Sequence, residues 1–215
     1  MPARVDPCLL AAAAAGLAPL AACGGLWAAR ATDPALAHIR AGLRPLSMVL
    51  AAGLAIGLAV AAWPTTMAGA LVCACLAGSA AADRDQLVLP DILTLAAVTL
   101  SLAMRPLAPL ESRVDLLVAG VGLYVGAIVF AAAMHLRYGR TAFGLGDVKL
   151  IAALGAILPA RLIGPAILAG GVSALACVGL PGRTAKPVIA LGLHLVVGSA
   201  LALGAAQAFP SFLGR

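Results

Sequence analysis

Charged side chains are scarce in this sequence. Asp, Glu, Lys and Arg make up only 10% of its 215 residues, while 63% of the residues are hydrophobic. Soluble domains carry about 25% charged residues. The mean hydropathy is +1.09. This balance excludes a soluble globular domain and indicates an integral membrane protein.

Two other patterns are missing. No two cysteines have the Cys-x-x-Cys spacing that zinc or redox sites use, and all five lie inside apolar segments, at Cys8, Cys23, Cys73, Cys75 and Cys177. The alternation of apolar and polar residues that marks a transmembrane barrel is absent as well. We therefore expect an all-α membrane protein, because a helix satisfies its backbone polar groups internally.

Eight apolar segments are candidates for membrane-spanning helices, since each approaches the ~20 residues that cross a bilayer. They cover residues 8–29, 47–63, 66–82, 89–104, 115–136, 147–160, 162–180 and 187–208. The longest gap between them, residues 30–47, has room for no more than an interfacial helix. We expect a polytopic bundle of about eight transmembrane helices.

Basic residues are divided unevenly between alternate ends of these segments. If the N-terminus lies outside, five basic residues lie outside and nine lie inside, namely Arg30, Arg40, Arg44, Arg84, Arg137, Arg140, Lys149, Arg183 and Lys186. Positive charge is retained on the cytoplasmic side of a membrane. This predicts that both termini are outside, and it explains the net charge of +6 without a nucleic-acid partner.

An acidic side chain at membrane depth is costly, so each one is a functional candidate. Four of the eight acids lie in terminal or loop positions and are interpreted as solvated: Asp6, Asp33, Glu111 and Asp115. Among the others, Asp147 and Asp91 occupy positions where an acid caps or begins a helix. Asp85 is interpreted as a solvated loop charge. Asp83 ends a segment, where the helix dipole disfavours an anion, so capping does not explain it.

Asp83 and Asp147 lie on different segments but at ends that face the same side, so they can converge. Two carboxyls in a poorly solvated place share one proton and titrate as a unit. This is the chemistry of an aspartic protease. Gly144 and Gly146, on either side of Leu145, would let a substrate backbone approach closely.

Two sequence blocks resemble the type 4 prepilin peptidases, which are membrane-embedded aspartic proteases of bacteria. "GLGD" at 144–147 is similar to their GxGD block, and "DRDQLVLPDILT" at 83–94 is similar to D-x6-P-[D/N]-x-[L/W]-T. The resemblance covers about residues 66–208 and implies a six-helix peptidase core there. Residues 1–65 would then form two N-terminal transmembrane helices with a short cytoplasmic loop.

The resemblance implies roles for individual residues. Asp83 and Asp147 would be catalytic. Six other residues would frame the substrate and the backbone around them: Gly144, Gly146, Lys149, Pro90, Asp91 and Thr94. Lys149 should point away from Asp147, because residues two apart on a helix do not face each other. No metal and no cofactor is implied.

The resemblance also implies a substrate and a location. The family cleaves the short basic leader of type 4 prepilins or pseudopilins after a glycine, at the inner face of the bacterial plasma membrane. Larger members carry paired cysteines in a domain after the first helix, and these support N-methylation. The corresponding residues 30–47 have no cysteine, so methyl transfer is not expected. The late P-x-G-P pattern is poorly kept at residues 186–193, which leaves the last helix's contribution open.

Other interpretations of these residues stay open at this point. A presenilin-like protease also uses GxGD, although its Tyr-Asp pair is absent here. A small proton- or cation-coupled transporter, or a homologue that binds pilins without cutting them, would also carry membrane acids. His38, His135 and His194 lack ligand spacing, and we expect the latter two to bond neighbouring helices. "LAAC", ending at Cys23, resembles a lipoprotein cleavage box.

Overall fold

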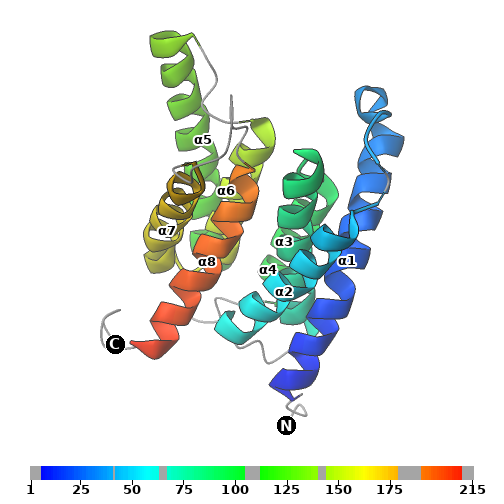
Figure 1. Cartoon of the computed structure of the whole chain (residues 1–215). Coiled ribbons are helices and arrows are strands. Elements are labelled where there is room, and N and C mark those ends of the chain that lie inside the picture. Colours follow the sequence, from blue (N-terminus) through cyan, green and yellow to red (C-terminus); the bar gives the residue numbers. More distant parts are fainter. Residues whose placement is uncertain are drawn as a thin grey trace.

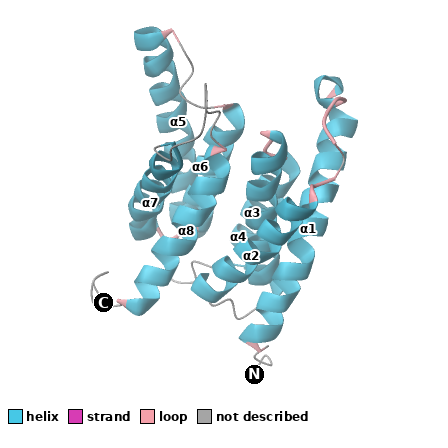
Figure 2. Cartoon of the chain, viewed as in Figure 1, coloured by secondary structure: helices cyan, strands magenta, loops and turns pink. Residues whose placement is uncertain are grey.

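The computed structural model describes residues 6–40, 42–62, 67–104, 112–139, 144–178 and 190–209. The described residues form eight α-helices and one 3-10 helix, η1, and contain no strand (Figures 1 and 2). The elements are α1 (Pro7–Thr32), η1 (Pro34–Leu36), α2 (Pro45–Ala62), α3 (Met67–Gln86), α4 (Asp91–Met104), α5 (Arg113–Tyr138), α6 (Leu145–Ile157), α7 (Ala160–Val178) and α8 (Leu191–Ala208). The predicted all-α fold is confirmed.

Each of the eight predicted segments corresponds to one helix. Five of the helices, α1, α3, α5, α7 and α8, are long and apolar enough to cross a membrane. Helices α2 and α4 are apolar but shorter, and α6 has only 13 residues. Between α1 and α2, the described residues form only the short helix η1, as the length of the gap predicted. The chain is thus a polytopic helical membrane protein.

Local sequence signals set several helix ends. Asp6 accepts a hydrogen bond from the Cys8 N–H at 2.8 Å and so caps the start of α1. The Ser112 hydroxyl does the same for the Asp115 N–H in α5, at 2.9 Å. Helix α5 ends at Gly139, whose φ of 65° is accessible to glycine without strain. Asp6 and Asp115 are exposed, as expected for solvated acids.

The helices form two neighbouring groups, α1 to α4 and α5 to α8 (Figure 1). The groups meet where α3 contacts α8, where α4 contacts α6 and where α2 contacts α8. Helix α3 lies deepest: 83% of the residues in its most apolar 18-residue stretch are buried, whereas only 17% are buried in the corresponding stretch of α5. The core therefore surrounds α3, and α5 lies at the periphery.

Small residues allow the helices to pack closely. A Cβ at Gly78 of α3 would lie 3.0 Å from the Ala18 carbonyl oxygen and 3.1 Å from the Ala22 nitrogen of α1. A Cβ at Gly198 of α8 would lie 2.2 Å from the Ala166 carbonyl oxygen of α7. In lipid, helix association depends on close backbone approach of this kind. These glycines thus determine how closely α3 packs on α1 and α8 packs on α7.

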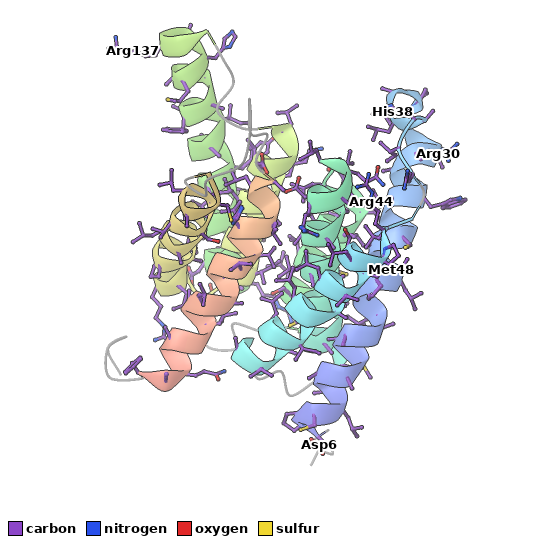
Figure 3. The ribbon with its side chains drawn as sticks, viewed as in Figure 1. Asp6, Arg30, His38, Arg44, Met48 and Arg137 are labelled. Carbon is purple, nitrogen blue, oxygen red and sulfur yellow. The ribbon has the colours of Figure 1, made fainter. Side chains whose placement is uncertain are left out.

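Helix α1 begins, and helix α8 ends, at the same end of the bundle. The N-terminal end of α1, marked by Asp6, and the C-terminal end of α8 lie at the bottom of the view (Figures 1 and 3). His38 and Arg137 lie at the opposite end (Figure 3). An even number of membrane crossings, as in the predicted topology, places both ends on one side in this way.

Candidate active site

Asp83 lies in the last turn of α3, where the sequence placed it. Its exposed fraction is only 6%, although the carboxylate lies near the end of the helix. The backbone N–H of Leu193, in the first turn of α8, donates a hydrogen bond to Asp83 Oδ2 at 3.4 Å. The positive end of the α8 dipole therefore faces a carboxylate that its own helix dipole disfavours.

Asp147 is the third residue of α6 and is half-buried. Its Oδ2 accepts a hydrogen bond from the Gly144 N–H at 3.1 Å. The predicted capping role is thus present. Among the described residues, one backbone N–H bonds this carboxylate, so capping leaves acceptor capacity on both oxygens.

The two carboxyls line the same cavity, which has a volume of about 550 Å³. They come from different helices, Asp83 from α3 and Asp147 from α6. A pair of acids held this way in a cavity can divide one proton between them, so that one is a base and the other an acid. This arrangement is able to carry out general acid–base chemistry on a bound peptide.

Glycines give the backbone room around the pair. A Cβ at Gly146 would lie 3.1 Å from Leu89 Cβ, and a Cβ at Gly192 would lie 2.8 Å from Asp83 Oδ2 and 3.0 Å from Leu89 Cδ2. The Leu89 side chain therefore fits between the first turns of α6 and α8. Gly144 is exposed at the cavity, and a Cβ there would lie 3.8 Å from Asp147 Oδ2, an ordinary van der Waals distance.

The remaining predicted residues divide into two groups. Asp91 and Lys149 line the cavity and form an ion pair between α4 and α6, with Nζ 2.5 Å from Oδ2. Lys149 thus pairs with Asp91 and not with Asp147. Pro90 and Thr94 are buried and do not line the cavity. The Thr94 hydroxyl donates to the Asp91 carbonyl at 2.9 Å, so both residues shape the start of α4.

The interpretation of Asp85 as a solvated loop charge was wrong. Asp85 belongs to α3, and its side chain is only 3% exposed. Its Oδ2 accepts the Arg44 backbone N–H at 3.1 Å, and its Oδ1 lies 3.4 Å from Arg44 Nε. Next to it, Gln86 Oε1 accepts the Arg40 N–H at 3.3 Å. The connection between α1 and α2 folds back onto the end of α3 and removes Asp85 from solvent.

Sequence reasoning did not identify the contribution of α8. The P-x-G-P pattern extends into residues 186–189, which lie outside the described part of the chain, but Gly192 and Leu193 begin the helix that contacts Asp83. It also missed α1, whose residues Gly25, Ala28, Ala29 and Thr32 line the cavity. The sequence signal for that face was that Ala28, Ala29 and Thr32 lie three, four and seven positions after Gly25.

The other candidates do not line the cavity. His194 Nδ1 and the Ser173 hydroxyl are 2.9 Å apart, which confirms the predicted bond from α8 to a neighbouring helix. His38 and His135 are exposed. Cys23 lies inside α1. Within the described ranges, no group of three or more His, Cys, Asp or Glu side chains could hold a metal ion.

Comparison with known proteins places the chain in a family. Residues 70–203 match the model of the type IV leader peptidase family, which is more than half of the sequence. No curated protein and no solved structure matches the chain. The matched residues include Asp83 and Asp147, most of α3 and all of α6. The chain therefore belongs to the type IV leader peptidase family.

Proposed function

We propose that this protein is a membrane-embedded aspartic endopeptidase. It cleaves the leader peptide of type 4 prepilins or pseudopilins at the cytoplasmic face of the bacterial inner membrane. The observation that carries the proposal is that Asp83 and Asp147 line one cavity from two separate helices, within a chain of the leader peptidase family. The proposed reaction uses no cofactor, and we propose that it occurs without N-methylation.

The reaction needs one ionised and one protonated carboxyl. The ionised carboxylate takes a proton from water as the water oxygen attacks the peptide carbonyl carbon, while the protonated acid donates a hydrogen bond to the carbonyl oxygen. When the C–N bond breaks, a proton passes to the leaving amine. The pair then returns to its singly protonated state, because the water supplied one proton and the amine accepted one.

The position of the pair supports a substrate that is partly in the membrane. Asp83 lies at the end of a long apolar helix, so the cavity lies where that helix leaves its apolar part. A basic leader would stay in water, and the apolar stem after the cleavage site would lie in lipid. Basic residues at this end, including Arg30, Arg44 and Arg84, favour the cytoplasmic side.

The decisive experiment is co-expression of the full chain with a candidate prepilin. The wild type should shorten the prepilin, and Asp83→Asn and Asp147→Asn should each lower the cleavage rate by about 10²- to 10⁴-fold, the usual contribution of an acid–base group. Asp115→Asn is the matched control, because Asp115 is exposed on α5 and does not line the cavity. All variants must insert into the membrane in equal amounts.

Two results would count against the proposal. Undiminished cleavage by Asp83→Asn or Asp147→Asn would reject the assigned pair. A wild-type protein that retains the prepilin on an affinity column but leaves it uncut would instead indicate a pilin-binding homologue without activity. Membership of a peptidase family argues against the transporter interpretation, and proton or cation flux in proteoliposomes would test it.

A further inference from the structure

Helix α1 forms one wall of the cavity, although it lies outside the residues matched by the family model. Its contribution is a single stripe made of Gly25, Ala28, Ala29 and Thr32. Residues separated by three, four and seven positions share one face of a helix. The stripe therefore faces the same space as Asp83 and Asp147.

Two close contacts fix α1 in this position. Gly78 of α3 meets the α1 backbone at Ala18 and Ala22, and a Cβ at Gly25 would lie 2.9 Å from Leu93 Cγ and 3.0 Å from Pro90 Cβ of the α4 start. The first contact seats α1 on the helix that carries Asp83. The second contact holds α1 against the start of α4. The stripe is thus held by close packing at two glycines, one against the α1 backbone and one against the Leu93 and Pro90 side chains.

Thr32 and Asp33, at the end of α1, also line the cavity, and each makes a local hydrogen bond. The Thr32 hydroxyl donates to the Ala28 carbonyl at 2.9 Å, and the Asp33 carboxylate accepts the Ala35 N–H at 2.9 Å, where it begins η1. The rest of the stripe is a surface of very small apolar groups. Ala28 and Ala29 are half-buried, so their methyl groups border the open space.

We propose that Ala28 and Ala29 determine substrate specificity by limiting the size of the side chain that fits beside the scissile bond. The inference rests on the proposed function, because it assigns a substrate-facing role in the same cavity. At Ala28 and Ala29 the wall presents only methyl groups, so it selects by volume there. Larger side chains at these two positions would occupy space that the substrate needs.

The first test compares substrates of different size. A prepilin is made with Ala, Val or Phe at a residue flanking the scissile bond, and each form is incubated with wild type, Ala28→Leu and Ala29→Leu. The Leu variants should lower the Phe-to-Ala cleavage ratio by about tenfold or more, since one methylene in a pocket discriminates 10- to 200-fold. Ala28→Gly and Ala29→Gly should raise that ratio.

Ala31→Leu is the matched control. Ala31 is exposed, lies one turn away from Ala28 and does not line the cavity, so the same change there should leave the ratio as in wild type. If the Leu variants at 28 and 29 slow all substrates by one common factor, or match Ala31→Leu, the inference is wrong. If wild type cuts none of the substrates, the proposed function itself fails.

A second test measures how close positions 28 and 29 lie to the bound substrate. Its readout is a cross-link and not a cleavage rate, and it needs no bulky substitution. Cys is introduced at position 28, 29 or 31 in a background that lacks the five native cysteines and still cuts the prepilin. Asp147→Asn is then added so that the prepilin stays bound uncut, and the prepilin carries a Cys beside the scissile bond. A one-carbon bis-thiosulfonate reagent then links the two cysteines if they are close. Adducts should form from positions 28 and 29 and not from 31. Equal yields from all three, or no adduct from 28 and 29, would overturn the inference.

Discussion

The backbone N–H of Leu193 donates a hydrogen bond to Oδ2 of Asp83, although the two residues are 110 positions apart. The bond joins the end of α3 to the beginning of α8. It supplies a donor to a carboxylate that lies at the unfavourable end of its own helix dipole. The position of one proposed catalytic acid thus depends on the last described helix of the chain.

Gly192→Ala should damage activity more than stability. The new Cβ would lie 2.8 Å from Asp83 Oδ2, so the carboxylate must move, but the atoms it meets are the ends of side chains that can shift. We expect cleavage to fall by about tenfold or more, because a displacement of ~1 Å from the productive geometry can cost 10²-fold. Thermal unfolding in detergent should change little. Gly122→Ala, in open space on α5, is the control.

Gly198→Ala should have the opposite profile. Its Cβ would lie 2.2 Å from the Ala166 carbonyl oxygen and 2.5 Å from the Gly170 nitrogen, and backbone atoms cannot move aside singly. We expect a loss of ~1 to 3 kcal/mol or more in the free energy of unfolding, as for an overpacked core. Denaturant titration in detergent measures it. Gly171→Ala, which has open space on α7, should not destabilise the protein, and equal losses would contradict this account.

The Asp91–Lys149 ion pair should contribute little to stability. Its side chains are 65% and 44% exposed, and exposed pairs contribute about 0.2 to 1 kcal/mol. A double-mutant cycle with Asp91→Asn and Lys149→Met should therefore give a coupling energy within that range, and it should shrink in high salt. A coupling of several kcal/mol would mean that the pair is shielded from solvent when the protein lies in its membrane.

Asp85→Ala should loosen the connection between α1 and α2. The mutation removes the acceptor for Arg44 beside the end of α3, while Arg44 itself is 64% exposed and can be hydrated. We expect faster trypsin cleavage after Arg40 and a modest loss of stability, about 1 kcal/mol. Asp85→Asn keeps an oxygen acceptor and serves as the control. Identical digestion rates for wild type and Asp85→Ala would show that this contact does not hold the loop.

Much of the fold was predictable because membrane helices are specified locally. A segment that crosses lipid must satisfy its own backbone, so apolar length alone located all eight helices. The candidate acids were also visible, since Asp83 and Asp147 stand at the ends of apolar segments in two recognisable blocks. Asp85 was misjudged because its burial comes from Arg44, which approaches from 41 residues away.

The sequence by itself determined the helices, the membrane class and the two acids in their blocks, since all of these depend on the order of residues within one segment. Only the tertiary structure decided that the Leu193 N–H would donate a hydrogen bond to Asp83 and that the Ala28–Ala29 face of α1 would border the cavity. Those relationships depend on how closely separate helices approach. That distance is set by contacts between small residues far apart in the chain, such as Gly78 with Ala18 and Ala22, and no single segment encodes it.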